Sequence, residues 1–241
     1  PTPAVSTPAP TPTGALPTAP STPVPAPTAA ATPTPGGPTQ VVIEASRDTT
    51  IFSDLTGNSN GAGAFLFSGR TRTGGIRRAL VHFDLAGKVP AGAEIVGARL
   101  SVTVSKSPGG ADPIVGFRLH RVTAAWGEGT SFASGGTGAA ATPGDATWTQ
   151  RIFGSTPLQQ PGGDFEAAAS AETELGASGQ FAWDSEQLLA DVRGWLQDPA
   201  GNYGWIVIGD ETTNRTPRQI RSSEAGTAEE RPRLVIVYRV P

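Results

Sequence analysis

A short glycine-rich stretch carries the residues whose types most suggest chemistry. Gly57-Asn58-Ser59-Asn60-Gly61 matches the G-x-S-x-G string of a nucleophile elbow, a strained turn that presents a serine between a strand and a helix. Here the chain that follows, Ala64 to Phe67, has a strand pattern, and only His82 and His120 could serve as a base. A glycine-rich turn is therefore the favoured interpretation, and no catalytic residue is expected.

The same stretch offers oxygen ligands for a metal ion. Asp54, Asn58 and Asn60 carry the hard oxygen donors that Ca²⁺ prefers, provided that backbone carbonyls complete the shell. Thr56 stands where an EF-hand loop would have its first aspartate, so that motif does not match. The sequence therefore offers this loop as a structural Ca²⁺ site, and no other cofactor is expected.

Carboxylates occur in two pairs, and a glycosidase needs a pair of carboxyl groups that flank the scissile bond. Asp210 and Glu211 follow a predicted strand, and Asp184 and Glu186 lie where a strand meets a helix. Nothing in their spacing places two of them across a cleft. A polar turn and a helix cap are the simpler roles, and the chain is not expected to be an enzyme.

Aromatic rings can bind sugars, because a ring face packs against the apolar face of a pyranose. Trp126 and Trp148 lie in or beside irregular segments, where such a face could be exposed, and Arg78 and His82 are polar candidates for the same ligand. For Trp126 a core or loop-anchoring role is the favoured alternative. The other three tryptophans fall within core patterns.

Charge and hydropathy exclude two classes of partner. The net charge is −3 and the pI is near 5.4, whereas phosphate binding needs a concentrated basic surface, so no nucleic-acid partner is expected. Arginines cluster at 70–78 and 215–221, where solubility and pairing with carboxylates explain them. No apolar run approaches the roughly 20 residues of a membrane-spanning helix, so no membrane span is expected.

The elements that must position these residues are mainly strands. In Arg77 to Leu85 the residues Ala79, Val81, Phe83 and Leu85 alternate with more polar ones, which predicts a strand with one buried and one solvated face. Glu94 to Val104 repeats the pattern, with Val96, Ala98, Leu100, Val102 and Val104 expected to point inward. A turn through Pro90-Ala91-Gly92 would join the two as an antiparallel pair.

Further strands are predicted at 40–45, 48–53, 64–67, 114–122, 181–183, 203–208, 218–222 and 234–238, of which 203–208 and 234–238 are apolar on both faces. The one convincing helix runs from Ser185 to Gln197, with Asp184 or Ser185 as its cap and Pro199 after its end. Residues 126–179 show only a weak strand signal. The fold class is thus all-β, a jelly-roll-like β-sandwich with one short helix, preceded by an extended Pro/Thr-rich N-terminal arm.

That arm differs sharply in composition from the rest of the chain. Residues 1–43 contain no charged side chain and hold 13 of the 23 prolines, so they cannot bury enough apolar surface to fold alone. We expect an extended arm or stalk at 1–39 and a β-sandwich domain at 40–241. Pro/Thr/Ser composition is typical of O-glycosylated extracellular stalks. The acceptors would be Thr11, Thr13, Thr18, Thr22 and Thr34.

The order of several short motifs resembles the DNRLRE-type domains, secreted β-sandwich modules that are classed among carbohydrate-binding modules. The matching segments are Asp48-Thr49-Thr50-Ile51, Asn60-Gly61, 78–85, 90–95, 98–100, 120–123, Trp126-Gly127-Glu128-Gly129-Thr130, Thr147-Trp148, Arg221-Ser222-Ser223-Glu224-Ala225 and 231–235. The resemblance implies a jelly roll with an accessory role outside the cell and no catalysis. The chain departs from the pattern at 131–144, where a Gly/Ala insertion replaces a second Trp-Asn segment.

Two functions follow as hypotheses. In the first, the protein is an extracellular or cell-surface structural protein whose arm docks on a neighbouring copy, and a head-to-tail contact of that kind generates a filament or another homo-oligomer. The adjoining strand could also complete a neighbour's sheet. In the second, the arm is a flexible stalk and the domain binds polysaccharide.

Overall fold

The computed structural model describes residues 37–108 and 114–241. The arm at 1–39, with its five threonine acceptors, lies almost wholly outside these residues. The longer strands are β1 (Thr39–Glu44), β2 (Arg47–Phe52), β4 (Phe65–Arg70), β5 (Ile76–His82), β6 (Glu94–Lys106), β7 (Val115–Val122), β11 (Phe165–Leu175), β12 (Gly179–Asp184), β13 (Trp205–Ile208), β14 (Arg218–Arg221) and β15 (Arg233–Arg239). The short strands are β3 (Asn58–Ser59), β8 (Ala139–Ala140), β9 (Gln150–Ile152) and β10 (Thr156–Pro157). The helix is α1 (Glu186–Gln197), and Pro199–Gly201 and Ala228–Glu230 form single 3₁₀ turns.

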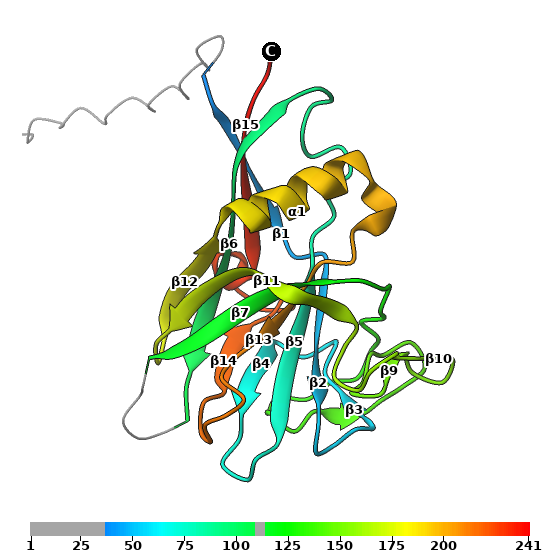
Figure 1. The fold of residues 1–241 in the computed structure, drawn as a ribbon. Coiled ribbons are helices and arrows are strands. Elements are labelled where there is room, and N and C mark those ends of the chain that lie inside the picture. The colour runs from blue at the N-terminus through cyan, green and yellow to red at the C-terminus, as the bar shows by residue number, and fades with distance from the viewer. Residues whose placement is uncertain (1–36, 109–113) are drawn as a thin grey trace, which may run out of the picture. The chain divides into compact units, whose positions relative to one another are not determined.

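The longer strands form one curled antiparallel sheet, which confirms the all-β, sandwich-like fold (Figure 1). Its order is β1-β15-β6-β14-β4-β5-β13-β7-β11, with β12 added to β6 and β2 added to β5. Strand β4 pairs with β14 on one side and with β5 on the other, so it is hydrogen-bonded to both layers and connects them. The two layers enclose the main core.

The expected pairing of the strand at 77–85 with the strand at 94–104 is wrong. β5 pairs with β2, β4 and β13, whereas β6 pairs with β12, β14 and β15. The connection through residues 83–93 is long enough to carry the chain from one layer to the other. Two half-buried strands that follow each other in sequence therefore face each other across the core instead of lying side by side.

Strand β5 also lacks the solvated face that its alternation suggests. Ala79, Val81 and Phe83 are buried in the main core as expected, but Leu80, on the opposite face, is only 4% exposed. It belongs to a second apolar cluster with Ile51, Val122, Trp126, Ala146, Ile206 and Ile208. The irregular segment after Trp126 covers this outer face, so the strand is buried on both sides.

A β-bulge changes which residues of β6 point inward. The register with β15 shifts between Val237 and Tyr238, which pair with Gly97 and Ile95, so one residue of β6 is skipped. Ile95 is consequently buried, and Val96, which was expected to point inward, is only half-buried. β13 is buried on both faces, as predicted, whereas Val235 and Val237 of β15 are half-buried.

The region after residue 126 contains a long strand that the sequence did not reveal. β11, with the sequence FEAAASAETEL, pairs with β7 over most of its length. Alanine and glutamate have low strand propensity, so the tertiary partner decides the conformation here. Two register shifts within the pairing show that the fit to β7 is irregular.

Helix α1 begins and ends as predicted. The Ser185 hydroxyl accepts a hydrogen bond from the Leu188 N–H at 2.9 Å and donates to the Ser170 carbonyl, so Ser185 and not Asp184 is the cap. One face buries Leu188, Leu189, Val192 and Trp195 against the main core. No helix in the described part of the chain is long and apolar enough to cross a bilayer.

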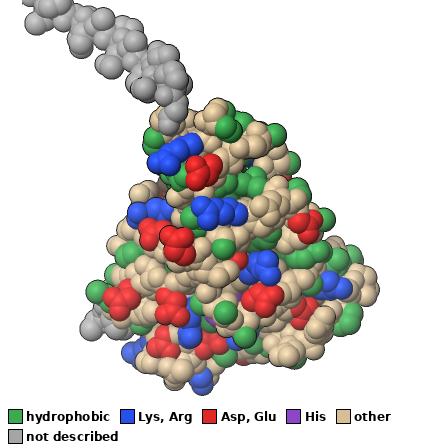
Figure 2. Space-filling model, turned by 45° about the horizontal axis from the view of Figure 1, so that its top comes forward, with side chains coloured by type: hydrophobic (Ala, Val, Ile, Leu, Met, Phe, Trp, Pro, Cys, Tyr) green, Lys and Arg blue, Asp and Glu red, His purple; other side chains and the backbone are tan. Residues whose placement is uncertain are grey.

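Several clustered arginines pair with carboxylates, as expected. Arg77 pairs with Asp54, Arg78 with Glu211 and Arg221 with Glu230. Figure 2 shows basic and acidic side chains interspersed over the face that it draws, without a broad field of one sign. Arg218 differs from these three arginines because its side chain is fully buried.

Candidate functional site

Trp126 lies in the second apolar cluster and is only 4% exposed. Its indole Nε1 donates to the Tyr203 carbonyl at 2.8 Å, and the Arg47 guanidinium lies 4.8 Å from the ring centroid. Both the ring and its polar atom are therefore occupied within the protein. In this structure Trp126 anchors the loop that it begins, which is the alternative that the sequence favoured.

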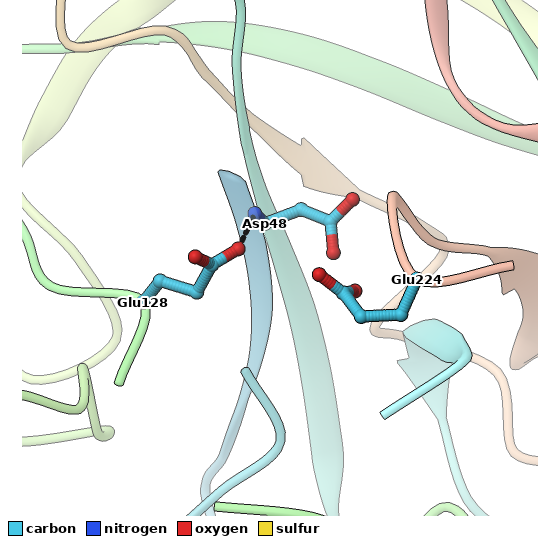
Figure 3. A group of neighbouring side chains, drawn as sticks. All are labelled: Asp48, Glu128 and Glu224. Atoms are coloured by element: carbon cyan, nitrogen blue, oxygen red, sulfur yellow. Dashed lines mark hydrogen bonds between the residues drawn. The ribbon is translucent and has the colours of Figure 1, made fainter. Parts of the chain in front are cut away.

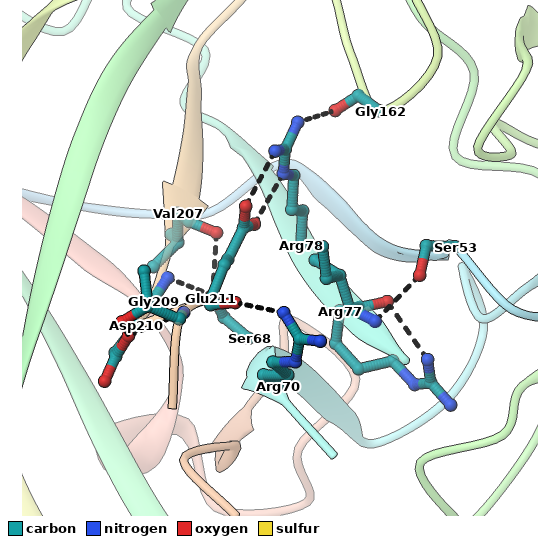
Figure 4. Close-up of polar contacts among 12 residues, drawn as sticks. Ser53, Ser68, Arg70, Arg77, Arg78, Gly162, Val207, Gly209, Asp210 and Glu211 are labelled. Carbon is teal, nitrogen blue, oxygen red and sulfur yellow. Dashed lines mark hydrogen bonds and ion pairs between the residues drawn. The ribbon is translucent and has the colours of Figure 1, made fainter. Parts of the chain in front are cut away.

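Trp148 and Arg78 lie together, away from the main core. The Arg78 guanidinium lies 5.0 Å from the Trp148 ring centroid. It also contacts both carboxylate oxygens of Glu211, at 2.7 and 2.9 Å (Figure 4). Its Nη1 also donates to the Gly162 carbonyl at 2.8 Å. Trp148 remains half-buried, so part of its surface is open beside a firmly held cation.

His82 lies at the end of β5, opposite Arg47 of β2. Its Nδ1 is 2.7 Å from the Ser46 hydroxyl. Burial, and after it the positive charge of Arg47, lowers the pKa of His82 to about 4. The imidazole is therefore neutral at pH 7.

This depressed pKa makes stability depend on pH. The unfolded chain protonates His82 below about pH 6.5, but the folded protein does so only near pH 4. Protons then bind more strongly to the unfolded state, so the stabilising effect of a neutral His82 is lost as pH falls from about 6.5 to 4. We expect the urea midpoint of the wild type to fall, relative to that of His82→Asn, across this window. Parallel curves for the two proteins would contradict the assignment.

The loop expected to bind Ca²⁺ places its three side chains on different partners. Asp54 pairs with Arg77, and the Asn58 amide donates to the Thr137 carbonyl at 2.9 Å. Asn60 is fully buried, donates to the Phe65 carbonyl and accepts from the Ala133 N–H at 2.7 Å. Asp54 and Asn60 thus use side-chain oxygens, and Asn58 its amide donor, on separate partners within the fold.

Ser59, the centre of the G-x-S-x-G string, does not form an elbow. It lies in β3 and is fully buried, and its Oγ is 3.0 Å from the Thr49 hydroxyl. The favoured turn is found only on either side of this residue, because Asn58 and Ser59 form a short strand that pairs with β8.

The paired carboxylates have separate structural roles. Asp210 accepts three hydrogen bonds from Thr212 and Thr213. Partial burial alone would raise the pKa of Asp210, but these hydrogen bonds outweigh it and lower that pKa to about 2. Glu211 holds Arg78, and Asp184 lies 3.6 Å from Arg99 on the surface.

The structure instead assembles three carboxylates that the sequence analysis did not select as a site. Asp48, Glu128 and Glu224 each place a carboxylate oxygen within 4.8 Å of the other two. Figure 3 shows the Asp48 carboxylate directed toward that of Glu224, with Glu128 approaching the Asp48 backbone. Asp48 is fully buried, Glu128 is half-buried and Glu224 is exposed, so the cluster leads from the interior to solvent.

Backbone contacts hold this acidic cluster together. Glu128 Oε1 accepts from the Asp48 N–H at 2.7 Å, and Asp48 Oδ2 accepts from the Ser223 N–H at 2.7 Å. Gly61 lets the loop of Glu128 approach, since a Cβ at Gly61 would lie 1.9 Å from the Glu128 carbonyl oxygen. Three segments distant in sequence thus meet at one point.

Electrostatically, the acidic cluster is unfavourable. Burial raises the pKa of Asp48 well above its usual range, and the charges of Glu224 and Glu128 add to this, partly opposed by the Ser223 hydrogen bonds. Burial also raises the pKa of Glu128, which the Asp48 N–H and Arg47 partly offset while Glu224 adds to it. Asp48 Oδ1 is buried and has no hydrogen-bond partner.

Each of the three carboxylates lies in a short segment that the sequence analysis had singled out, in Asp48-Thr49, Trp126-Gly127-Glu128 and Ser223-Glu224 respectively. Because the segments are separated by 80 residues or more, spacing gave no reason to combine them.

A scan against protein-family models finds no match to this chain, and a search of curated proteins finds none either.

Proposed function

We propose that this chain is a non-catalytic, extracellular structural protein of the cell surface that assembles into a filament or matrix. The arm at 1–39 and the adjoining strand β1 would make the contact between copies. The observation that carries the proposal is the exposed edge of β1, which continues directly from the arm. The separate structural roles of Asp184, Asp210 and Glu211 support a protein without catalysis.

Strand β1 is well suited to accept another strand. It pairs with β15 from Thr39↔Tyr238 to Glu44↔Arg233, and within the described residues no strand pairs with its other edge. Its sequence, TQVVIE, has one charged residue, Glu44, and that charge pairs with Arg231 at 3.0 Å. Val42 is 48% exposed.

Natural edge strands usually carry lysine, proline or a bulge that prevents pairing with another chain. β1 has none of these within its six residues. An incoming strand could add to it through backbone hydrogen bonds, with Val42 in the contact. If the contact is head-to-tail it does not close on itself, and assembly continues as a filament.

The arm would reinforce this contact and set the environment. Its Pro/Thr composition supports an extended, glycosylated segment outside the cell, with Thr11, Thr13, Thr18, Thr22 and Thr34 as acceptors. We propose that the domain belongs to the DNRLRE-type domains. Only the order of the short motifs along the sequence supports this proposal.

Val42→Lys tests the proposal. A lysine on the open edge should prevent strand addition while leaving the β1–β15 pairing intact. We expect the wild type to form large assemblies by light scattering and electron microscopy, and Val42→Lys, or deletion of residues 1–38, to stay monomeric. Val240→Lys is the matched control, because Val240 is 50% exposed but lies beyond the end of β15. A wild type that remains monomeric at high concentration would refute the proposal.

Polysaccharide binding is the second candidate, and a groove of about 420 Å³ favours it. Arg78, Gln159, Gln160, Asp164 and Phe165 line it, so a cation, two amides, a carboxylate and an aromatic ring border one opening. Such groups suit sugar hydroxyls and carboxylates. The partly open Trp148 ring lies against Arg78 beside it.

Affinity electrophoresis on gels that contain acidic or neutral polysaccharides tests this candidate. We expect retardation that Trp148→Ala and Gln160→Ala reduce. Trp126→Ala does not test ligand binding directly, because Trp126 is buried. It shows instead how much retardation is lost when the fold itself is disturbed. Unretarded migration of the wild type in every gel would remove this candidate.

A further inference from the structure

We propose that Asp48, Glu128 and Glu224 bind a Ca²⁺ ion that ties together three segments of the fold. The proposal rests on the geometry of the acidic cluster and on an unpaired buried oxygen within it. It does not depend on the proposed function, because the site uses none of the residues of β1 or of the arm.

The oxygens lie close enough together for one Ca²⁺ ion to contact all three. Two ligands on opposite sides of Ca²⁺ are separated by about 4.6–5.2 Å, because each bond is about 2.3–2.6 Å long. One oxygen from each carboxylate lies within 4.8 Å of the others. A single ion of calcium's size can therefore contact all three without large movements.

The protein balances the charge of the cluster only in part. Among the described residues, every ion pair within 4.0 Å involves other carboxylates than these three. Arg47, the cation next in sequence to Asp48, lies over the Trp126 ring and forms no ion pair with these carboxylates, although its charge partly offsets the raised pKa of Glu128. Three neighbouring carboxylates without a paired cation are costly, particularly where one of them is fully buried.

Asp48 Oδ1 provides the independent indication of a ligand. The carboxylate belongs to a side chain with no exposed surface, and Oδ2 is satisfied by the Ser223 N–H. Oδ1 has no hydrogen-bond partner, although a buried unpaired oxygen costs free energy. The Asp48 carboxylate faces Glu224 (Figure 3), and a cation bound there by both carboxylate oxygens of Asp48 would satisfy Oδ1.

The three carboxylates become progressively more buried, which gives an ion a path from solvent into the site. Glu224 is exposed in the turn after β14, Glu128 is half-buried in the loop after β7, and Asp48 is fully buried in β2. An ion can enter past Glu224 and complete its shell with water on that side. Because β2 and β14 belong to opposite layers, the bound ion would fasten the two layers to each other and to the covering loop.

Terbium luminescence and thermal unfolding of the full chain test the site. Trp126 is two residues from Glu128, so we expect excitation of tryptophan to sensitise Tb³⁺ emission, and Ca²⁺ to displace it in preference to Mg²⁺. After treatment with a chelator, Ca²⁺ at about 100 times its dissociation constant should raise Tm by about 5–10 °C.

Glu224→Gln is the main variant, because an exposed side chain can be changed without unfolding the protein. We expect it to weaken Ca²⁺ binding about tenfold or more, since affinity depends on the number of charged ligands. Glu172→Gln is the matched control, an exposed glutamate on β11 outside the cluster, and should bind Ca²⁺ like the wild type.

The variant Asp48→Asn distinguishes two explanations of the cluster, a cation site and a pair of carboxyl groups that share a proton. For a cation site, this variant should lose the Ca²⁺-dependent rise in Tm, yet equal or exceed the wild-type Tm in chelator, because a buried negative charge is removed. A wild-type Tm that Ca²⁺ does not change, or a Ca²⁺ response that survives in both Glu224→Gln and Asp48→Asn, would overturn the proposal.

Discussion

Trp205→Ala should lower the free energy of unfolding by about 3–5 kcal/mol, the usual cost of removing a large buried aromatic side chain. Trp205 lies in β13 with no exposed surface. Its ring packs edge-on to Trp195 of α1, with centroids 4.4 Å apart, and to Phe83 at 6.2 Å. The substitution therefore opens a cavity where the helix meets the sheet.

Urea denaturation followed by circular dichroism measures this loss. Trp205→Phe retains most of the ring but removes the Nε1 donor that Asp191 accepts at 3.0 Å, so we expect a smaller loss of about 1–3 kcal/mol. Phe132→Ala, at a side chain 64% exposed, should change stability by less than about 0.5 kcal/mol. A loss of less than about 1.5 kcal/mol for Trp205→Ala would show that this contact is not part of a close-packed core.

Arg218→Met should cost about 3 kcal/mol, because it leaves several buried carbonyl oxygens unpaired. Arg218 has no exposed surface, although it lies in a cluster of arginines. Its guanidinium donates to the carbonyls of Leu175, Gly176, Thr216 and Pro217, at 2.6–3.4 Å. It thus fastens the end of β11 to the segment that leads into β14.

Thermal unfolding should show this loss as a fall in Tm of about 6–12 °C for a domain of this size. Arg218→Lys should recover little of it, because an ammonium cannot reproduce the planar fork of donors. Arg239→Met is the control, since Arg239 is exposed at the end of β15. Equal Tm values for Arg218→Met and Arg239→Met would refute the role assigned to Arg218.

Local patterns in the sequence predicted most of the elements correctly. Alternation placed Ala79, Val81 and Phe83 in the core, because successive strand residues point to opposite faces whatever their partner strand is. The helix was predicted from its apolar spacing and from Ser185 before it, which are also local signals. The apolar run at 205–208 correctly indicated a strand buried on both faces.

Pairing between strands could not be predicted in this way. The turn at 90–92 suggested a hairpin, yet β5 and β6 face each other across the core, because a connection through 83–93 permits either arrangement. The bulge opposite Val237 moved Ile95 into the core in place of Val96. β11 was missed because its alanines carry no strand signal until β7 lies beside them.

The candidate site shows the same difference between what local sequence patterns predict and what contacts between distant segments decide. Oxygen-rich residues close in sequence, Asp54, Asn58 and Asn60, suggested a metal site, but their side chains bind separate partners. The carboxylates that do converge come from β2, the loop after β7 and the turn after β14. Each is an ordinary surface-type residue in its own segment, so only the folded chain reveals the cluster.

By itself, the sequence determined the composition break near residue 40, the two-residue alternation of the strands and the one amphipathic helix, because these depend only on neighbouring residues. Only the tertiary structure decided which strands are partners, that Leu80 and Trp126 are covered, and that Asp48, Glu128 and Glu224 meet. These outcomes depend on contacts between residues that are far apart in the chain, where the spacing of residue types carries no information about distance.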